Sequence, residues 1–228
     1  PKPPRATEPP AINSALGVKA VRYRVWHTKE AEAAYISQLE LQSLLGRAMR
    51  RAGLPMAFSQ GFHPLPLISF GRALPVGVES QAEWFSIVLR EPLSAEEVMK
   101  RLAPRMLRGL RLDRLEEIPV NDKSGGSGQE TFSLRFVGSD ADRRLFMEAG
   151  DDFTATDSLM FTRETKKGPR TADIRPLFQV IEWDEHGTLY IVTDWSETYI
   201  SPMTLARAIT PWAEQDQLKI MKLSQMFG

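Results

Sequence analysis

The stretch 50–80, RRAGLPMAFSQGFHPLPLISFGRALPVGVES, indicates most about how this chain folds. It is rich in residues that bend or stiffen the backbone, namely Gly61, Gly71, Gly77, Pro55, Pro64, Pro66 and Pro75. Glycine permits backbone angles that other residues avoid, whereas proline fixes φ and favours an extended residue before it. The stretch therefore predicts a defined loop between short strands, where proteins commonly carry their binding groups.

The same region contains basic residues but no acidic ones. No Asp or Glu occurs between Glu40 and Glu79. Arginine can grip an oxyanion through two parallel hydrogen bonds, and a loop histidine can donate to one. We therefore predict a site that binds an anionic substrate through Arg47, Arg50, Arg51, Gln60, Gly61, His63 and Arg72. The alternatives are a solvated helix face for the arginines and a loop-stabilising histidine.

Periodicity predicts the elements around this loop. Residues 21–27 alternate as a half-buried strand, and Ser37 with Glu40 forms a capping box that opens a helix ending near Gly53. Strands follow at 66–70, 84–90 and 110–115, and a second helix runs from a capping box at Ser94 and Glu97 to Leu102. The order β-α-β-β-α-β is typical of a ferredoxin-like unit.

The second half repeats the pattern approximately. Past a flexible linker at 121–129 we expect strands at 132–136, 159–165, 173–183 and 188–195, with helices at 139–149 and from Ser201-Pro202. The fold class expected is α+β, with two ferredoxin-like (βαββαβ-type) antiparallel-sheet units in tandem. The domains expected are a Pro-rich linker at 1–19, an N-terminal unit at 20–120 and a C-terminal unit at 130–228.

Three further basic residues of the second half could contact a polyanion. Lys166 and Lys167 lie at an expected hairpin tip, and Arg175 lies in the run ADIRP. A merely soluble turn and a structural pair with Asp173 are the alternatives. Four aromatic residues of the first half could stack on nucleic-acid bases or belong to the core: Trp26, Phe58, Phe62 and Trp84.

Composition limits the chemistry. The chain has 29 basic and 29 acidic residues, but residues 1–80 hold ten Lys and Arg against five Asp and Glu. With no cysteine and only three histidines, disulfides, thiol catalysis and cysteine-ligated zinc or iron–sulfur sites are excluded, and we predict no metal site. No nucleotide-binding or nucleophile-elbow motif occurs, so no residue is assigned as catalytic and His63 is only a weak candidate. There is no apolar run long enough to cross a membrane and no secretory signal, and we expect a cytoplasmic location.

Several motifs resemble one bacterial family, the radical-SAM-linked proteins. They are the helix start at Ser37–Leu41, the run Arg50–Pro55, the loop Gln60–Pro64, Ala73–Gly77, the Lys-rich stretch ending at Asp173–Pro176 and Ser201-Pro202, within residues 21–213. At the helix start this chain has Gln38 where the family usually has His, and Glu40 where it usually has Asp. The resemblance therefore assigns no chemistry to Gln38.

The resemblance implies a partner. Such domains are fused to, or encoded beside, a radical S-adenosylmethionine domain, so S-adenosylmethionine and an iron–sulfur cluster are expected only there and no cofactor in this chain. The Pro-rich start PKPPRATEPP fits a junction behind such a domain. The family's association with ribosome genes suggests RNA, such as tRNA or rRNA undergoing modification, or ribosomal components. The hypothesis is a non-catalytic recognition domain. The alternatives are a metal-independent RNA-processing enzyme using a loop His (His63 or His27) and a protein-interaction module that docks the radical-SAM domain.

Overall fold

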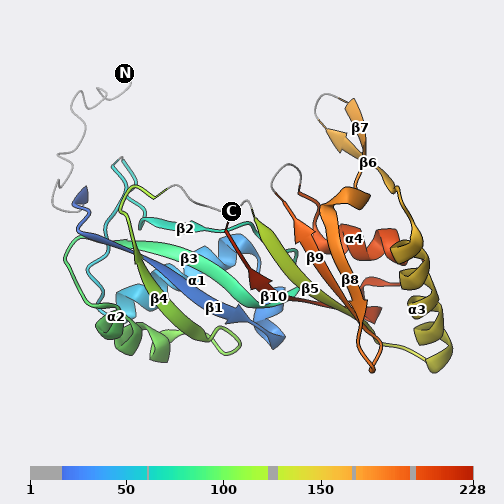
Figure 1. Ribbon diagram of the computed structural model, residues 1–228. Coiled ribbons are helices and arrows are strands. Elements are labelled where there is room, and N and C mark those ends of the chain that lie inside the picture. Colours follow the sequence, from blue (N-terminus) through green and yellow to red (C-terminus); the bar gives the residue numbers. More distant parts are fainter. Residues whose placement is uncertain (1–16, 61, 123–127, 166–167, 196–198, 228) are drawn as a thin grey trace, which may run out of the picture. The chain divides into compact units, whose positions relative to one another are not determined.

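The computed structural model describes residues 17–60, 62–122, 128–165, 168–195 and 199–227 (Figure 1). It is a mixed α+β protein with mostly antiparallel strand pairing, and its described part contains four α-helices. The chain forms two compact units. Unit 1 comprises Pro1–Thr28, Ile36–Gly71 and Trp84–Lys123, and unit 2 comprises Lys29–Tyr35, Arg72–Glu83 and Ser124–Gly228. Unit 2 thus includes two segments from the N-terminal half of the chain.

Unit 1 follows the order strand, helix, two strands, helix, strand. Its elements are β1 (Val21–Lys29), α1 (Gln38–Arg51), β2 (Ile68–Phe70), β3 (Glu79–Leu89), α2 (Ala95–Leu102), the 3-10 turn η3 (Ala103–Arg105) and β4 (Leu112–Ile118). The last residue of β1 and the first five of β3 belong to unit 2. The strands lie in the order β4-β1-β3-β2. The β4–β1 and β3–β2 pairs are antiparallel, with Tyr23 opposite Glu117 and Ile87 opposite Ile68.

The core of unit 1 takes in more of its strands than alternation predicted. The expectation of a half-buried strand at 21–27 is wrong in this respect, because every residue of β1 except Arg22 is buried. β3 is buried from Trp84 to Leu89, and α1 buries the side that carries Leu41, Leu45 and Met49. On α2, Val98 and Leu102 are fully buried. The expected capping box at Ser37 is confirmed. The one expected at Ser94 is only half formed, because the Glu97 carboxylate accepts from Arg101 instead.

Unit 2 contains the remaining elements. They are η2 (Ala31–Tyr35), β5 (Gln129–Phe136), α3 (Asp140–Ala155), β6 (Met160–Thr165), β7 (Gly168–Asp173), η4 (Arg175–Leu177), β8 (Phe178–Trp183), β9 (Thr188–Asp194), α4 (Pro202–Ile209), η5 (Gln215–Gln217) and β10 (Leu218–Gln225). The strands lie in the order β10-β5-β9-β8 with antiparallel neighbours, while β6 and β7 pair only with each other. The start of β3 pairs with β10 in parallel.

An aromatic-rich core holds unit 2 together. Phe132, Leu134 and Phe136 of β5 pack in one cluster with residues of α3 and α4. The α3 helix approaches the sheet closely at Gly150, where an added Cβ would lie 2.2 Å from Cζ2 of Trp183. The absence of a side chain at this position therefore lets Trp183 pack against the helix.

Two sequence expectations for unit 2 need correction. A single strand over 173–183 was expected, but β7 ends at Asp173, η4 follows and β8 begins only at Phe178. Pro176 has no N–H to donate to a neighbouring strand, which favours a break there. Strand β10 was not expected from the sequence, and it pairs with β5 over most of its length. The expected Pro at the first helical position of α4 is confirmed at Pro202.

Candidate functional site

The α1 helix presents the basic residues of the predicted site. Ser37 Oγ accepts from the backbone N–H of Glu40, and the Glu40 carboxylate accepts from Ser37 N at 2.9 Å and Ser37 Oγ at 2.6 Å. These bonds, the side-chain one first, hold the pKa of Glu40 below its ordinary value. Because one side of the helix is buried against the sheet, Arg47, Arg50 and Arg51 are exposed on the others.

A groove of about 430 Å³ follows one side of α1. Its walls come from α1 and from the Gly/Pro-rich stretch: Leu39, Gln42, Ser43, Gly46, Arg47, Arg50, Leu65, Pro66 and Ile68. An added Cβ on Gly46 would lie 3.8 Å from Nη2 of Arg50, so the Arg50 guanidinium lies beside this glycine. We call this the α1 groove. It brings Arg47 and Arg50 together with the stretch that the sequence had singled out.

The α1 groove is basic. None of its lining residues is acidic, and within the described part of the chain no ion pair joins Arg47 or Arg50 to a carboxylate. Both guanidinium groups are therefore available to an external anion. Leucines at the rim, Leu39 and Leu65, are exposed by 77% and 59%, so a ligand there would also meet apolar surface.

The predicted loop lies next to the groove. The Ser59 N–H donates to the Leu65 carbonyl at 2.8 Å, and Ser59 Oγ accepts from Leu65 N at 3.0 Å, which closes the loop over residues 60–64. Gln60 and His63 are exposed on it and do not line the groove. Phe62 is 73% exposed. Gly61 lies outside the described residues.

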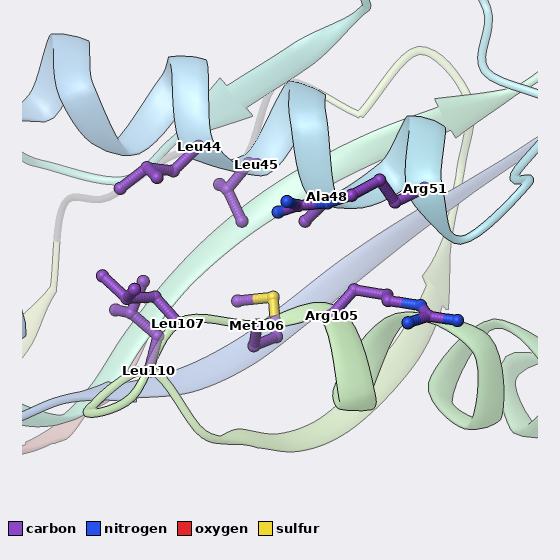
Figure 2. Close-up of a pocket in the computed structure, with 8 residues that line it drawn as sticks. All are labelled: Leu44, Leu45, Ala48, Arg51, Arg105, Met106, Leu107 and Leu110. Atoms are coloured by element: carbon purple, nitrogen blue, oxygen red, sulfur yellow. The ribbon is translucent and has the colours of Figure 1, made fainter.

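Arg51 lines a different and smaller pocket. This pocket has a volume of about 90 Å³ and lies between α1 and the segment from η3 to Leu110 (Figure 2). Figure 2 shows the Arg51 side chain running back along α1 over the pocket, while the Arg105 guanidinium points away from the leucines. The remaining lining is apolar: Leu44, Leu45, Ala48, Met106, Leu107 and Leu110. Arg51 is therefore not part of the α1 groove.

Arg72 belongs to unit 2. Its guanidinium carbon lies 4.2 Å from the ring centroid of Tyr199, and its Nη1 atom is buried with no hydrogen-bond partner among the described residues. Burial, followed by the nearby charge of Glu130, raises the pKa of Tyr199 to about 12. Arg72 thus lies in a mostly buried polar cluster of unit 2 that the sequence did not reveal.

Arg175 is used to hold the chain of unit 2 together. Its guanidinium donates to the backbone carbonyls of Thr156 at 2.7 Å, Phe178 at 3.1 Å and Thr154 at 3.2 Å. The preceding carboxylate, Asp173, accepts from the N–H of Leu159 and of Arg175 itself. These bonds account for the run ADIRP structurally. The predicted anion contacts Lys166 and Lys167 lie outside the described residues.

The tryptophans of unit 1 are core residues. Trp26 and Trp84 are each only 4% exposed. Arg114 covers the ring of Trp26 at 4.3 Å, and Arg24 covers that of Trp84 at 5.0 Å. Bases cannot stack on rings already covered in this way, so the structural alternative holds for both.

The described residues form neither a metal site nor a membrane-spanning helix. Among the residues that the model describes, no group of three or more His, Asp or Glu side chains is arranged to hold a metal ion. No helix in the described ranges has the length and apolar character needed to span a bilayer. The basic α1 groove is therefore the feature that best matches the sequence expectation.

The fold and groove define a mixed α+β protein with a basic groove on its first helix. The chain belongs to the family described as "Uncharacterized protein conserved in bacteria (DUF2344)", whose model matches residues 22–216. No curated protein matches the sequence. Among solved structures it is similar to the acetolactate synthase small subunit from Thermotoga maritima, with a TM-score of 0.27, 8% identity, and coverage of 92% of this chain and 98% of that one. A score that low supports no conclusion about this chain.

Proposed function

We propose that this protein is a non-catalytic recognition domain that binds an anionic macromolecule, RNA, through the α1 groove. The observation that carries the proposal is the pair Arg47 and Arg50, exposed on one groove wall with no carboxylate among the lining residues. Phosphates of a nucleic-acid backbone suit guanidinium groups because two parallel hydrogen bonds can form. RNA in single-stranded form also presents apolar base faces, for which the exposed leucines of the rim offer contact.

We also propose that each unit is ferredoxin-like. The strand orders β4-β1-β3-β2 in unit 1 and β10-β5-β9-β8 in unit 2 support this. When the strands of each unit are counted along the chain and the β6–β7 hairpin is treated as an insertion, both units have the order fourth, first, third, second. The α1 groove then lies where α1 meets the Gly/Pro-rich stretch that leads into β2.

The radical-SAM partnership is part of the same proposal. The Arg-Arg-Ala-Gly-Leu-Pro and Gln-Gly-Phe-His-Pro motifs of this chain support it by resemblance, and the chain itself has no cysteine to hold an iron–sulfur cluster. The recognition domain would then hold RNA in the cytoplasm for an enzyme that carries S-adenosylmethionine and the cluster. A binding measurement between this chain and a fused or neighbouring radical-SAM domain tests that step.

RNA binding is tested by fluorescence anisotropy with a labelled single-stranded RNA at several salt concentrations. We expect the logarithm of affinity to fall linearly with the logarithm of salt, by about 0.7 per phosphate contact. Replacing Arg47 and Arg50 by Ala should weaken binding and remove about one contact each from that slope. Arg108→Ala is the control, since Arg108 is exposed in the same unit but outside the groove. The proposal is contradicted if RNA affinity does not change with salt concentration. It is also contradicted if Arg108→Ala weakens RNA binding as much as Arg47→Ala or Arg50→Ala does.

A second function is favoured by the apolar rim. Leu39 and Leu65 on the groove and Phe62 on the adjoining loop are exposed, as expected of a protein-docking surface. The domain would then dock the radical-SAM domain through this face and ignore RNA. Leu39→Glu should abolish such docking, whereas under the first proposal it should weaken RNA binding less than Arg47→Ala does.

A further inference from the structure

A separate basic pocket lies in unit 2. It has a volume of about 440 Å³ and forms where the end of β5, the start of α3 and the turn between β8 and β9 come together. Its lining residues are Arg135, Phe136, Val137, Gly138, Arg143, His186, Gly187 and Thr188. Three different elements thus each contribute one nitrogen-bearing side chain, and none of the lining residues is acidic.

Strand pairing places Arg135 beside another positively charged residue. In the antiparallel pair of β5 and β10, Arg135 lies directly opposite Lys219, and on its other side it faces the uncharged Thr188. Like charges directly opposite each other destabilise a sheet. Both side chains are exposed, and no ion pair in the described ranges neutralises either one. A bound anion would relieve this repulsion.

The neighbouring carboxylates do not fill the pocket. Asp140 lies 3.5 Å from Arg143 but is 87% exposed, and Glu185 lies 3.5 Å from His186 on the outer surface. Asp184 is turned into its own loop, where it accepts from Thr188 N at 2.8 Å and His186 N at 2.9 Å. Asp184 therefore fixes the turn that presents His186, and it leaves the arginines open to solvent.

We infer that this pocket binds a small phosphorylated ligand, with Arg135 and Arg143 holding the phosphate. Two guanidinium groups that line one pocket from different elements suit the several oxygens of a phosphate monoester, and His186 offers a third donor. The volume lies within the usual range of small-molecule pockets, about 300–1,000 Å³. The site is independent of the α1 groove, because it uses none of the same residues.

Isothermal titration calorimetry on the whole chain tests the inference, with inorganic phosphate and adenosine monophosphate as probes and with adenosine and malonate for comparison. We expect saturable binding of the two phosphates, weaker binding of malonate and none of adenosine. Arg135→Ala and Arg143→Ala should each weaken phosphate binding about tenfold or more, as the loss of charge-assisted hydrogen bonds implies. Arg144→Ala is the matched control, since this neighbouring arginine is exposed on α3 but does not line the pocket.

A thermal melt separates binding from folding. Removing the charge at Arg135 relieves its repulsion with Lys219, so Arg135→Ala should keep or slightly raise the melting temperature while phosphate binding is lost. Arg135→Lys keeps the charge but not the paired donors, and should also weaken binding. The inference is wrong if neither phosphate saturates, if malonate binds as tightly, or if Arg144→Ala weakens binding as much as Arg143→Ala.

Discussion

Removing the ammonium group of Lys222 should destabilise unit 2 strongly. Lys222 lies on β10 with its side chain only 1% exposed. Its Nζ donates to Glu83 Oε1 at 2.9 Å and to Gln225 Oε1 at 2.6 Å, and lies 3.0 Å from Glu130 Oε1. Glu130 also accepts from Trp195 Nε1 at 2.8 Å. One buried cation therefore serves two carboxylates whose side chains are 13% and 4% exposed.

The magnitude follows from what Lys222→Met would leave behind. Two buried carboxylates would lose the only ammonium group paired with them in the described chain. Breaking a buried ion pair by removing one partner costs about 3–5 kcal/mol. In a chain of this size each kcal/mol shifts the melting temperature by roughly 2–4 °C, so a decrease of roughly 6–20 °C is expected.

The charge state of Lys222 gives the pH dependence. Burial alone would lower the pKa of Lys222, but the carboxylates of Glu83 and Glu130 outweigh burial and the net pKa is raised above 10.5. A raised folded pKa means that the stabilisation is complete below the unfolded value and is lost as pH rises through the folded one. The wild type should therefore lose this stability only in strong alkali, and Lys222→Met should lack that alkaline step.

Urea unfolding at neutral pH, followed by circular dichroism and tryptophan fluorescence, measures the effect. Lys219→Met is the matched control, because Lys219 is exposed on the same strand and its loss should change stability by no more than about 0.5 kcal/mol. Adding Glu83→Gln and Glu130→Gln to Lys222→Met removes the unpaired charges and should restore most of the stability. If Lys222→Met is no less stable than Lys219→Met, the buried cluster does not hold unit 2 together as argued.

Two further changes test the packing and the capping directly. Gly150→Ala should destabilise the protein by about 1–3 kcal/mol, because the new Cβ would lie 2.2 Å from Trp183. Gly46→Ala on α1 should instead stabilise it by up to about 1 kcal/mol, because the nearest atom to its new Cβ lies 3.8 Å away. Thermal melts in which Gly46→Ala is the less stable variant would show that Gly150 does not pack against Trp183 as described. Ser37→Ala should cost about 1 kcal/mol. The hydrogen bonds from Ser37 lower the pKa of Glu40, so the stabilisation they give is present above the ordinary pKa of 4.5 and is lost as the pH falls through the lowered value. Ser37→Ala should therefore lose less stability than the wild type when the pH is lowered through this range.

Features that depend on residues close together in the chain could be predicted from the sequence. The capping box at Ser37 involves residues three positions apart, and the exposed arginines of α1 follow from helical spacing, so both could be found without coordinates. The partners of Lys222 could not, because Glu83 lies 139 residues away and the pairing depends on β10 lying beside both β3 and β5. The role of Arg175 could not be predicted either, because the carbonyls of Thr154 and Thr156 that accept its hydrogen bonds come close to it only in the folded chain.

The zero net charge of the chain limits the source of any affinity that the α1 groove has for RNA. A strongly basic protein attracts polyanions from a distance, but here 29 positive and 29 negative side chains cancel, and physiological salt screens what remains beyond about 8 Å. Affinity for RNA must therefore come from contacts inside the groove and not from a general field. It follows that single arginines in the groove should matter more than arginines elsewhere on the surface, so the comparison of Arg47→Ala with Arg108→Ala is the decisive one.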